Sequence, residues 1–200
     1  MRRTHRTAKS ASASTILESI VGPLYLAASD EGLTHLLFVD EMSDRPRTVP
    51  AASGSPAGRI LREAVRQLRE YFAGKRRAFD VLLAPEGTPF QCETWRGLRT
   101  IGYGETVSYA ELARRVGKPG AARAVGMANG ANPIAIIVPC HRVIGADGTL
   151  TGYGGGLHVK QALLELEGVS VRSGRRPPRG RNAPPSPSTA RLPLLTRTDR

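Results

Sequence analysis

The sequence places two side chains suited to nucleophilic chemistry next to each other, Cys140 and His141. They follow an apolar run over residues 134–138, and Pro139 restricts the backbone just before them. An imidazole can draw the proton from a thiol and so create a nucleophilic thiolate. Because adjacent side chains diverge, a bridging water would connect the two groups. A lone cysteine after an apolar run also fits a small buried hydrophobic residue, and both interpretations stay open at this point.

Glu167 is the candidate for a third member of this group. It falls at the C-terminal end of the last predicted helix, where the helix dipole disfavours a carboxylate. An acid in that place can instead orient the imidazole of His141, which gives a Cys–His–Glu relay. A solvated glutamate at a helix end is the alternative interpretation. Cys92 falls in the first turns of another predicted helix with no base beside it, and we predict a structural role for it.

The size and charge of the chain narrow the class of protein. Its 200 residues, 40% of them hydrophobic, allow one ordinary domain or two small ones and exclude a large multidomain machine. The formal net charge is +12, and it is concentrated at the ends: residues 1–12 hold four basic side chains, and residues 172–200 hold eight arginines and one acid. Such charge suits a polyanionic partner such as nucleic acid. We expect a disordered basic arm over 1–12 and a disordered Arg/Pro-rich tail over 172–200.

Cysteine usage and hydropathy indicate the setting. Two cysteines cannot form a disulfide framework, and they do not combine with the four histidines at the spacing of zinc ligands. The N-terminus lacks the apolar run of a signal peptide, and no apolar stretch reaches membrane-spanning length. We therefore expect a cytoplasmic protein with no membrane contact, no metal and no cofactor.

The first half, residues 13–85, is predicted to be a small α+β domain with an antiparallel sheet. Short apolar runs within residues 15–40, separated by turn residues, predict a β-meander. A serine and a proline at 55–56 predict the start of a helix, whose apolar residues recur on one face until Gly74 ends it. Residues 79–83 predict one more strand.

The second half, residues 86–171, is predicted to be mainly helical. Thr88 and Gln91 have the spacing of a capping box at the start of one helix, and Ser108 and Glu111 repeat that spacing at the start of the next.

The spacing of the next two predicted helices is typical of a DNA-binding motif. Two short helices over 109–116 and 121–129 flank a tight turn at 118–120, which is the pattern of a helix-turn-helix. An ordinary pair of antiparallel helices has the same spacing, so the pattern alone leaves both open. Residues 134–138 predict a buried strand or extended segment, and residues 159–167 predict the last helix.

Several linked motifs give the chain a resemblance to a known family. In chain order they are residues 103–109 (YGETVSY), 121–126 (AARAVG), 132–133 (NP), 139–143 (PCHRV) and 152–157 (GYGGGL). Together they closely resemble the active-site signature of the O6-alkylguanine-DNA alkyltransferases, also called methylated-DNA–protein-cysteine methyltransferases. The match is strong from about residue 88 to 168, whereas the first half is similar only in length, order and short fragments. The resemblance implies a winged helix-turn-helix-like second domain.

The resemblance implies a role for each residue of the relay. Cys140 corresponds to the nucleophile that accepts the alkyl group. His141, acting through a water, corresponds to the base that removes its proton, and Glu167 corresponds to the carboxylate that fixes the imidazole. Asn132 corresponds to the residue that joins the active site to the recognition helix.

The resemblance also implies the contacts with DNA. Tyr109 corresponds to the tyrosine that contacts the extruded base and helps to neutralise the departing guanine, and Arg123 to the arginine that fills the gap in the base stack. The other implied contacts are a guanine pocket of Tyr153 with the backbone around Val143 and Gly154, and a close approach to the DNA backbone at Ala122 and Ala124.

The implied function is stoichiometric DNA repair. The partner would be double-stranded DNA that contains O6-alkylguanine, bound in the minor groove with the damaged base rotated out. The alkyl group would move to Cys140, and because water does not easily displace a group from a thioether, each molecule would act once. We expect a monomer with no obligate protein partner, and O4-alkylthymine stays open as a second substrate.

The chain departs from the family pattern at a few places. Gly102 stands where proline is usual and Thr94 where an aliphatic residue is usual. Neither belongs to the catalytic set, so we expect activity, with stability as the property at risk. The Arg/Pro-rich tail lies outside the pattern and is either a solvated extension or a source of non-specific phosphate contacts.

Two other functions are alternatives to stoichiometric DNA repair. One is a non-catalytic protein on the same scaffold that binds alkylation damage or regulates DNA, but relatives of that type lack the cysteine. The other is a Cys–His–Glu hydrolase of esters or amides. That enzyme would need an oxyanion site and would turn over repeatedly, and it leaves the helix-turn-helix without a purpose.

Overall fold

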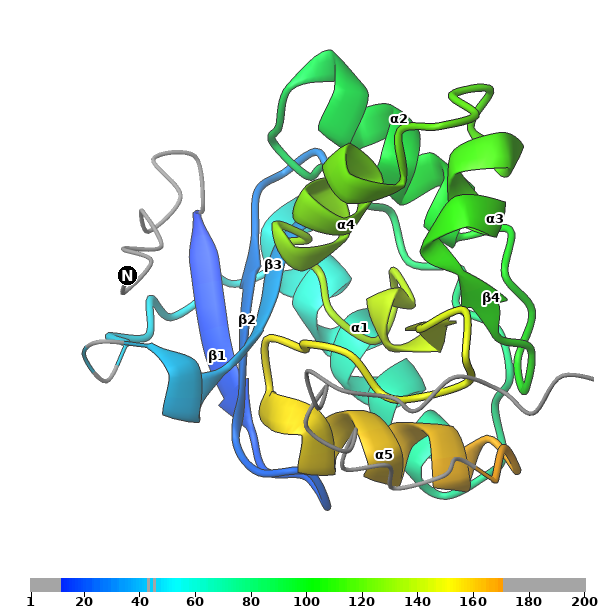
Figure 1. Cartoon of the computed structure of the whole chain (residues 1–200). Coiled ribbons are helices and arrows are strands. Elements are labelled where there is room, and N and C mark those ends of the chain that lie inside the picture. The colour runs from blue at the N-terminus through cyan, green and yellow to red at the C-terminus, as the bar shows by residue number, and fades with distance from the viewer. Residues whose placement is uncertain (1–11, 43, 45, 171–200) are drawn as a thin grey trace, which may run out of the picture.

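A computed structural model describes residues 12–42, 44 and 46–170. In the view of Figure 1 the sheet lies on the left, the helices α2 to α4 lie at the upper right, and α5 runs along the bottom. The predicted arm, apart from Ser12, and the predicted tail lie outside the described residues.

The first half of the chain folds around a three-stranded antiparallel sheet. Its strands β1 (Ala13–Leu17), β2 (Leu24–Ala28) and β3 (Leu33–Phe38) pair in the order β1-β2-β3. A short 3-10 helix, η1 (Val39–Glu41), follows β3. Every residue of β2 is buried, as expected for a central strand with covered faces. The predicted meander is confirmed.

Helix α1 (Pro56–Phe72) packs on this sheet. The Ser55 side chain accepts a hydrogen bond from the amide of Gly58 at the N-terminus, and the proline takes the first helical position. Gly74 follows the helix with a φ of 70°, a conformation that side chains with a Cβ resist. Both predicted ends are therefore confirmed. The buried face of α1 includes Leu68 and Tyr71.

The strand predicted over residues 79–83 is wrong. In the structure this segment forms a single parallel bridge, between Leu83 and Leu33. The amide of Leu33 donates to the Leu82 carbonyl and the amide of Ala84 donates to the Leu33 carbonyl, and the pairing extends no further as a strand. The apolar residues of the segment are instead used to pack irregular backbone against the core.

Three helices form the body of the second half. They are α2 (Pro89–Leu98), α3 (Tyr109–Arg115) and α4 (Ala122–Gly130). The capping box at the start of α2 is complete, and the Ser108 side chain accepts from the amide of Glu111 at the start of α3. The indole of Trp95 donates to the Ala128 carbonyl at 2.9 Å, which ties α2 to α4. These contacts agree with the predicted α+β class and its helical second half.

Short elements link these helices to the segment that carries the thiol. Cys140–Arg142 is a 3-10 helix (η2), and the strand β5 (Val143–Ile144) follows it directly. β5 pairs in parallel with β4 (Val107–Ser108), and β4 lies just before α3 in the chain. The last helix, α5 (Gly156–Leu166), begins three residues earlier than predicted. The β4–β5 pair therefore fixes the start of α3 relative to η2.

The strand or extended segment predicted over residues 134–138 is also wrong. Ile134 makes one bridge to Leu36, with the Leu36 amide donating to the Pro133 carbonyl and the Ala135 amide donating to the Leu36 carbonyl. The chain then turns instead of continuing along β3. All five residues are buried, so their unbroken apolar character reflects burial and not a strand.

No helix of the described ranges, 12–42, 44 and 46–170, has the length and apolar character needed to cross a membrane.

Candidate active site

Two unusually tight turns lead to Cys140. Ile136 has a φ of 69°, and the amide of Ile137 donates to the Ala135 carbonyl two residues earlier at 2.8 Å. Pro139 closes a second such turn, in which the amide of Cys140 donates to the Val138 carbonyl. A positive φ at a β-branched residue costs about 1–3 kcal/mol and persists only where the surroundings enforce it. The strain therefore lies four residues before the predicted nucleophile.

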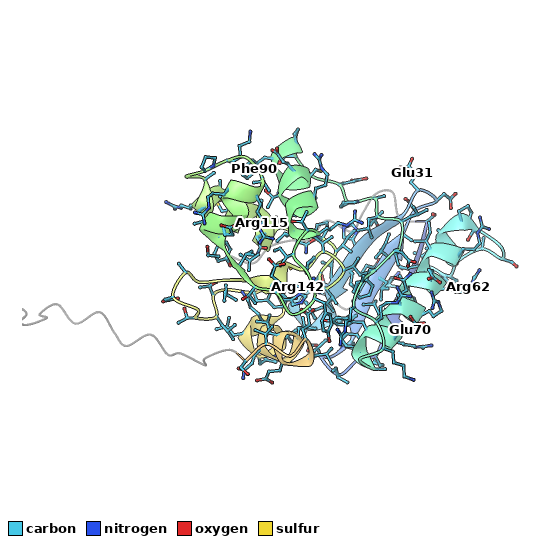
Figure 2. The ribbon with its side chains drawn as sticks, turned by 90° about the vertical axis from the view of Figure 1, so that its right-hand side faces the viewer. Glu31, Arg62, Glu70, Phe90, Arg115 and Arg142 are labelled. Atoms are coloured by element: carbon cyan, nitrogen blue, oxygen red, sulfur yellow. The ribbon has the colours of Figure 1, made fainter. Side chains whose placement is uncertain are left out.

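The 3-10 helix η2 separates three neighbouring side chains. With about three residues per turn, Cys140, His141 and Arg142 point in different directions from one short element. The thiol faces Asn132, whereas the imidazole and the guanidinium both reach Glu167 at the end of α5. Figure 2 shows Arg142 near the centre of the molecule.

Asn132 holds the thiol and the preceding turns together. Its side-chain amide donates to the Cys140 sulfur at 3.1 Å and to the Val138 carbonyl at 2.8 Å, and its oxygen accepts from the Ile134 amide at 3.0 Å. One buried side chain two residues after the end of α4 thus connects the segment that follows this helix to the thiol.

The electrostatic surroundings keep the thiol protonated at rest. Burial raises the pKa of Cys140, while the hydrogen bond from Asn132 and the positive charge of Lys160 act in the opposite direction. Because burial dominates, the sulfur needs a base to become a thiolate.

His141 has the properties of that base. Its Nε2 lies 2.9 Å from Oε1 of Glu167, and because a carboxylate only accepts, Nε2 carries the proton and Nδ1 keeps a lone pair. Nδ1 is buried and has no hydrogen-bond partner among the described residues. Burial lowers the pKa of His141, although Glu167 opposes this, so the ring is neutral near pH 7. A neutral ring with a free lone pair can accept a proton.

Glu167 is the centre of a buried network. Arg142 donates to both of its oxygens, from Nε at 2.8 Å and from Nη2 at 2.9 Å, and Gly104 adds a backbone amide at 3.2 Å. Although burial opposes ionisation, hydrogen bonds from His141 and Arg142 lower the pKa of Glu167 to about 2. The carboxylate is therefore charged, and the solvated helix-end alternative is excluded because Glu167 is only 5% exposed.

Lys160 is a residue of the site that the sequence analysis missed. It is fully buried in α5, and its ammonium donates to the Val143 carbonyl at 2.6 Å and to the Thr151 carbonyl at 3.0 Å. Burial lowers its pKa to about 8. A lysine within the apolar face of the last helix was the available signal. Lys160 therefore connects β5 to the loop of residues 145–155 that precedes α5.

Separate contacts place the two tyrosines that are predicted to bind the extruded base. The Tyr109 hydroxyl accepts from Thr151 at 3.1 Å, and the Tyr153 ring packs edge-on against Phe38 of β3 with centroids 5.8 Å apart. Val143 is buried beside the thiol segment and Gly154 is exposed. Tyr109 thus contacts the loop that contains Tyr153, and Tyr153 itself packs on β3.

The outer face of α4 is separate from the buried relay. Arg123 and Ala124 are exposed, Ala122 is half-buried, and Met127 on the same helix is 65% exposed. The Tyr109 ring of α3 lies against Gly126, where an added Cβ would sit 3.4 Å from the ring. The glycine therefore permits the two helices to meet closely.

Comparison with known proteins gives consistent matches along both halves. Residues 13–85 match the model of the 6-O-methylguanine DNA methyltransferase ribonuclease-like domain, and residues 89–169 match the DNA binding domain of the same name. The chain is 53% identical over 153 residues to the methylated-DNA–protein-cysteine methyltransferase of Methanosarcina acetivorans, with coverage of 76% of this chain and 96% of that protein.

Solved structures give the same result. The crystal structure of the Mycobacterium tuberculosis O6-methylguanine methyltransferase matches with a TM-score of 0.68 and 53% identity, over 77% of this chain and 91% of that one. The M. tuberculosis OGT in complex with DNA matches with a TM-score of 0.66 and 55% identity, over 76% and 90%.

The fold and the site define a class of protein in which a buried cysteine next to a buried His–Glu pair is combined with a helix-turn-helix-like unit. Within that class, the chain belongs to the 6-O-methylguanine DNA methyltransferase family. The resemblance seen in the sequence is thereby confirmed.

Proposed function

We propose that this protein repairs DNA by moving the alkyl group of O6-alkylguanine to Cys140. The observation that carries the proposal is the geometry of the relay: Asn132 hydrogen-bonds the thiol, and a neutral His141 is anchored by Glu167. The family to which the chain belongs supports it, as do the names of its relatives.

The reaction follows from the protonation states of these groups. Nδ1 of His141 accepts the thiol proton through a water, and the sulfur attacks the alkyl carbon. The S–C bond forms as the C–O bond breaks, and the electron pair stays on the guanine, which takes up a proton donated by the Tyr109 hydroxyl. His141 releases the thiol proton to solvent, and solvent returns a proton to Tyr109. Displacement at carbon develops no tetrahedral oxyanion, so the chemistry needs no oxyanion hole. The thioether is stable, so each molecule acts once.

Access to the base requires that it leave the duplex, because its O6 is out of reach in the stack. The α3–α4 pair would bind the minor groove through the small residues Ala122 and Ala124, and exposed Arg123 would fill the space left by the base. Tyr153 and the backbone at Val143 and Gly154 would receive the guanine. The similarity to a relative solved in complex with DNA supports the binding of DNA.

The test is transfer of a labelled alkyl group. The protein is incubated with duplex DNA that carries labelled O6-methylguanine, and we expect label on Cys140 with a yield no greater than one per molecule. Cys140→Ser should abolish transfer, whereas Cys92→Ser, the matched control at the other free cysteine, should retain it. O4-methylthymine in the same assay measures the second substrate, and mass measurement in solution tests the expected monomer.

Other outcomes identify the competing functions. If the parent protein binds damaged DNA without transferring label, and Cys140→Ser binds it equally well, the protein is a non-catalytic binder. Sustained turnover of a chromogenic ester would instead indicate a hydrolase. Label on any other residue would contradict the proposed role of Cys140.

A further inference from the structure

The first half of the chain reaches the buried relay through Tyr71. This residue lies in the last turn of α1, and its hydroxyl donates to Oε1 of Glu167 at 2.8 Å, although 96 positions separate the two in sequence. Both side chains are buried. The contact joins the sheet-and-helix half to the carboxylate that anchors His141.

The surroundings of Tyr71 fix its hydroxyl in this place. Its ring packs against the rings of Phe72 and Phe79, with centroids 5.4 Å away in each case, and edge-on against Tyr103 at 6.2 Å. Burial and the neighbouring charge of Glu167 raise the pKa of Tyr71, so the phenol keeps its proton and acts as a donor. A rigid aromatic cluster thus holds one neutral donor against the carboxylate.

The oxygen that Tyr71 contacts is the one that anchors the base. Oε1 of Glu167 accepts from Tyr71, from Nε2 of His141 and from Nη2 of Arg142, all between 2.8 and 2.9 Å. Donors to one oxygen share its negative charge, so each weakens the pull of that oxygen on the others.

We propose that Tyr71 is a positioning residue for alkyl transfer: its hydroxyl fixes Oε1 of Glu167 and limits the negative charge that this oxygen presents to His141. The proposal rests on the proposed function. It gives the first half of the chain a direct part in setting the strength of the base, beyond its packing against the second half.

The expected effect of removing the hydroxyl has a definite sign. In Tyr71→Phe, more negative charge faces the proton on Nε2 of His141, which stabilises the imidazolium. The pKa of His141 rises, and a larger fraction of molecules at mildly acidic pH holds a ring that cannot accept the thiol proton. The acid limb of the rate profile therefore moves to higher pH.

The experiment measures the single-turnover rate of alkyl transfer by the full chain across pH. For Tyr71→Phe we expect the acid limb to move up by about one pH unit, so that the rate on that limb falls by up to about tenfold, while the rate at higher pH and the DNA affinity stay unchanged. An acid limb that coincides with that of the parent protein would overturn the proposal.

Tyr103→Phe is the matched control. It lies in the same aromatic cluster, and its hydroxyl donates to the Leu166 carbonyl at 2.8 Å, next to Glu167 but not to its carboxylate. We expect a similar loss of stability and no movement of the acid limb. Equal movement in both variants would contradict the assignment to Tyr71. In a Glu167→Gln background, Tyr71→Phe should add no further change to the profile.

Two further measurements separate this proposal from the function on which it rests. A nuclear magnetic resonance titration of His141 should show a higher pKa in Tyr71→Phe, whether or not alkyl transfer is observed; an unchanged value would overturn the proposal. If Tyr71→Phe does not fold, 3-fluorotyrosine in place of Tyr71 provides a stronger donor with the same ring. It should move the acid limb to lower pH, and a limb moved upward or not at all would count against the proposal.

Discussion

At the scale of single residues, the site depends on a division between a neutral pair and a charged pair. Burial favours the neutral forms of Cys140 and His141, whereas Glu167 and Arg142 remain ions that satisfy each other at 2.8 and 2.9 Å. A buried ion pair that loses one partner leaves an uncompensated charge, which is strongly destabilising. The network that orients the base is therefore also a part of the core.

The pH dependence of stability should reveal this double role. The pKa of Glu167 falls from 4.5 to about 2 on folding, so its charged form contributes stability above pH 4.5, and this is lost as the pH falls towards 2. The shift corresponds to about 3 kcal/mol. In urea unfolding, Glu167→Gln should be less stable than the parent above pH 4.5, and this difference should shrink as the pH is lowered. A difference that stays constant with pH would mean that the carboxylate does not ionise in this way.

At the scale of elements, local signals predicted where several helices begin and end, but they did not predict the conformation of the segments that connect them. Ser55, Thr88 and Ser108 cap their helices as predicted because a cap requires only a few neighbouring residues. The apolar run 134–138 predicts a buried strand or extended segment, because its periodicity cannot separate either of these from a buried turn. Its positive φ at Ile136 depends on tertiary contacts.

The site was predictable to the extent that its residues lie in short motifs. Cys140, His141 and Asn132 lie within nine positions, and the structure brings them together with Glu167. Tyr71 and Lys160 were missed because each stands on the apolar face of a helix, where sequence periodicity assigns it to the core. The hydroxyl of Tyr71 finds its partner only when the two halves of the chain pack together, and the ammonium of Lys160 finds its partners only when the segment after η2 folds against α5.

The α4 helix carries a prediction about DNA. Arg123→Ala should slow alkyl transfer from duplex DNA by about 10- to 100-fold, because the vacancy left by the base would no longer be filled and the cost of extrusion is a few kcal/mol. The exposed side chain contributes little to folding, so thermal unfolding should not change. Transfer from the free base O6-methylguanine should also be unaffected.

Arg62→Ala is the matched control. Arg62 is an exposed arginine on α1, and Figure 2 shows it far from Arg115 of α3, the helix that packs against α4. It should leave transfer from duplex DNA unchanged. If both variants slow the reaction equally, general loss of positive charge explains the effect, and Arg123 has no special part in extrusion.

At the scale of the whole molecule, several contacts that join the two halves involve the buried network or the segments next to it. The edge of β3 hydrogen-bonds residues 133 and 135, Phe38 packs on Tyr153, and Tyr71 reaches Glu167. The sheet therefore packs on one side of the site, while α3 and α4 lie on another side of the site (Figure 1). Changes in the first half should consequently alter the rate of alkyl transfer more than the affinity for DNA.

Charge at the whole-molecule scale is a property of the ends of the chain, and it leads to a prediction about salt. Residues 172–200 carry a net +7, whereas residues 13–171 carry only +1. Each phosphate contact contributes about −0.9 to the slope of log K against log salt concentration. Removal of 172–200 should therefore flatten the slope for undamaged duplex DNA, measured by fluorescence anisotropy, while the rate of transfer at saturating DNA stays the same.

Glutamine at the eight tail arginines should reproduce the truncation, and lysine at these positions should restore the slope. A slope that does not change on truncation would show that the tail makes no phosphate contacts, and that DNA binding depends on the folded part alone.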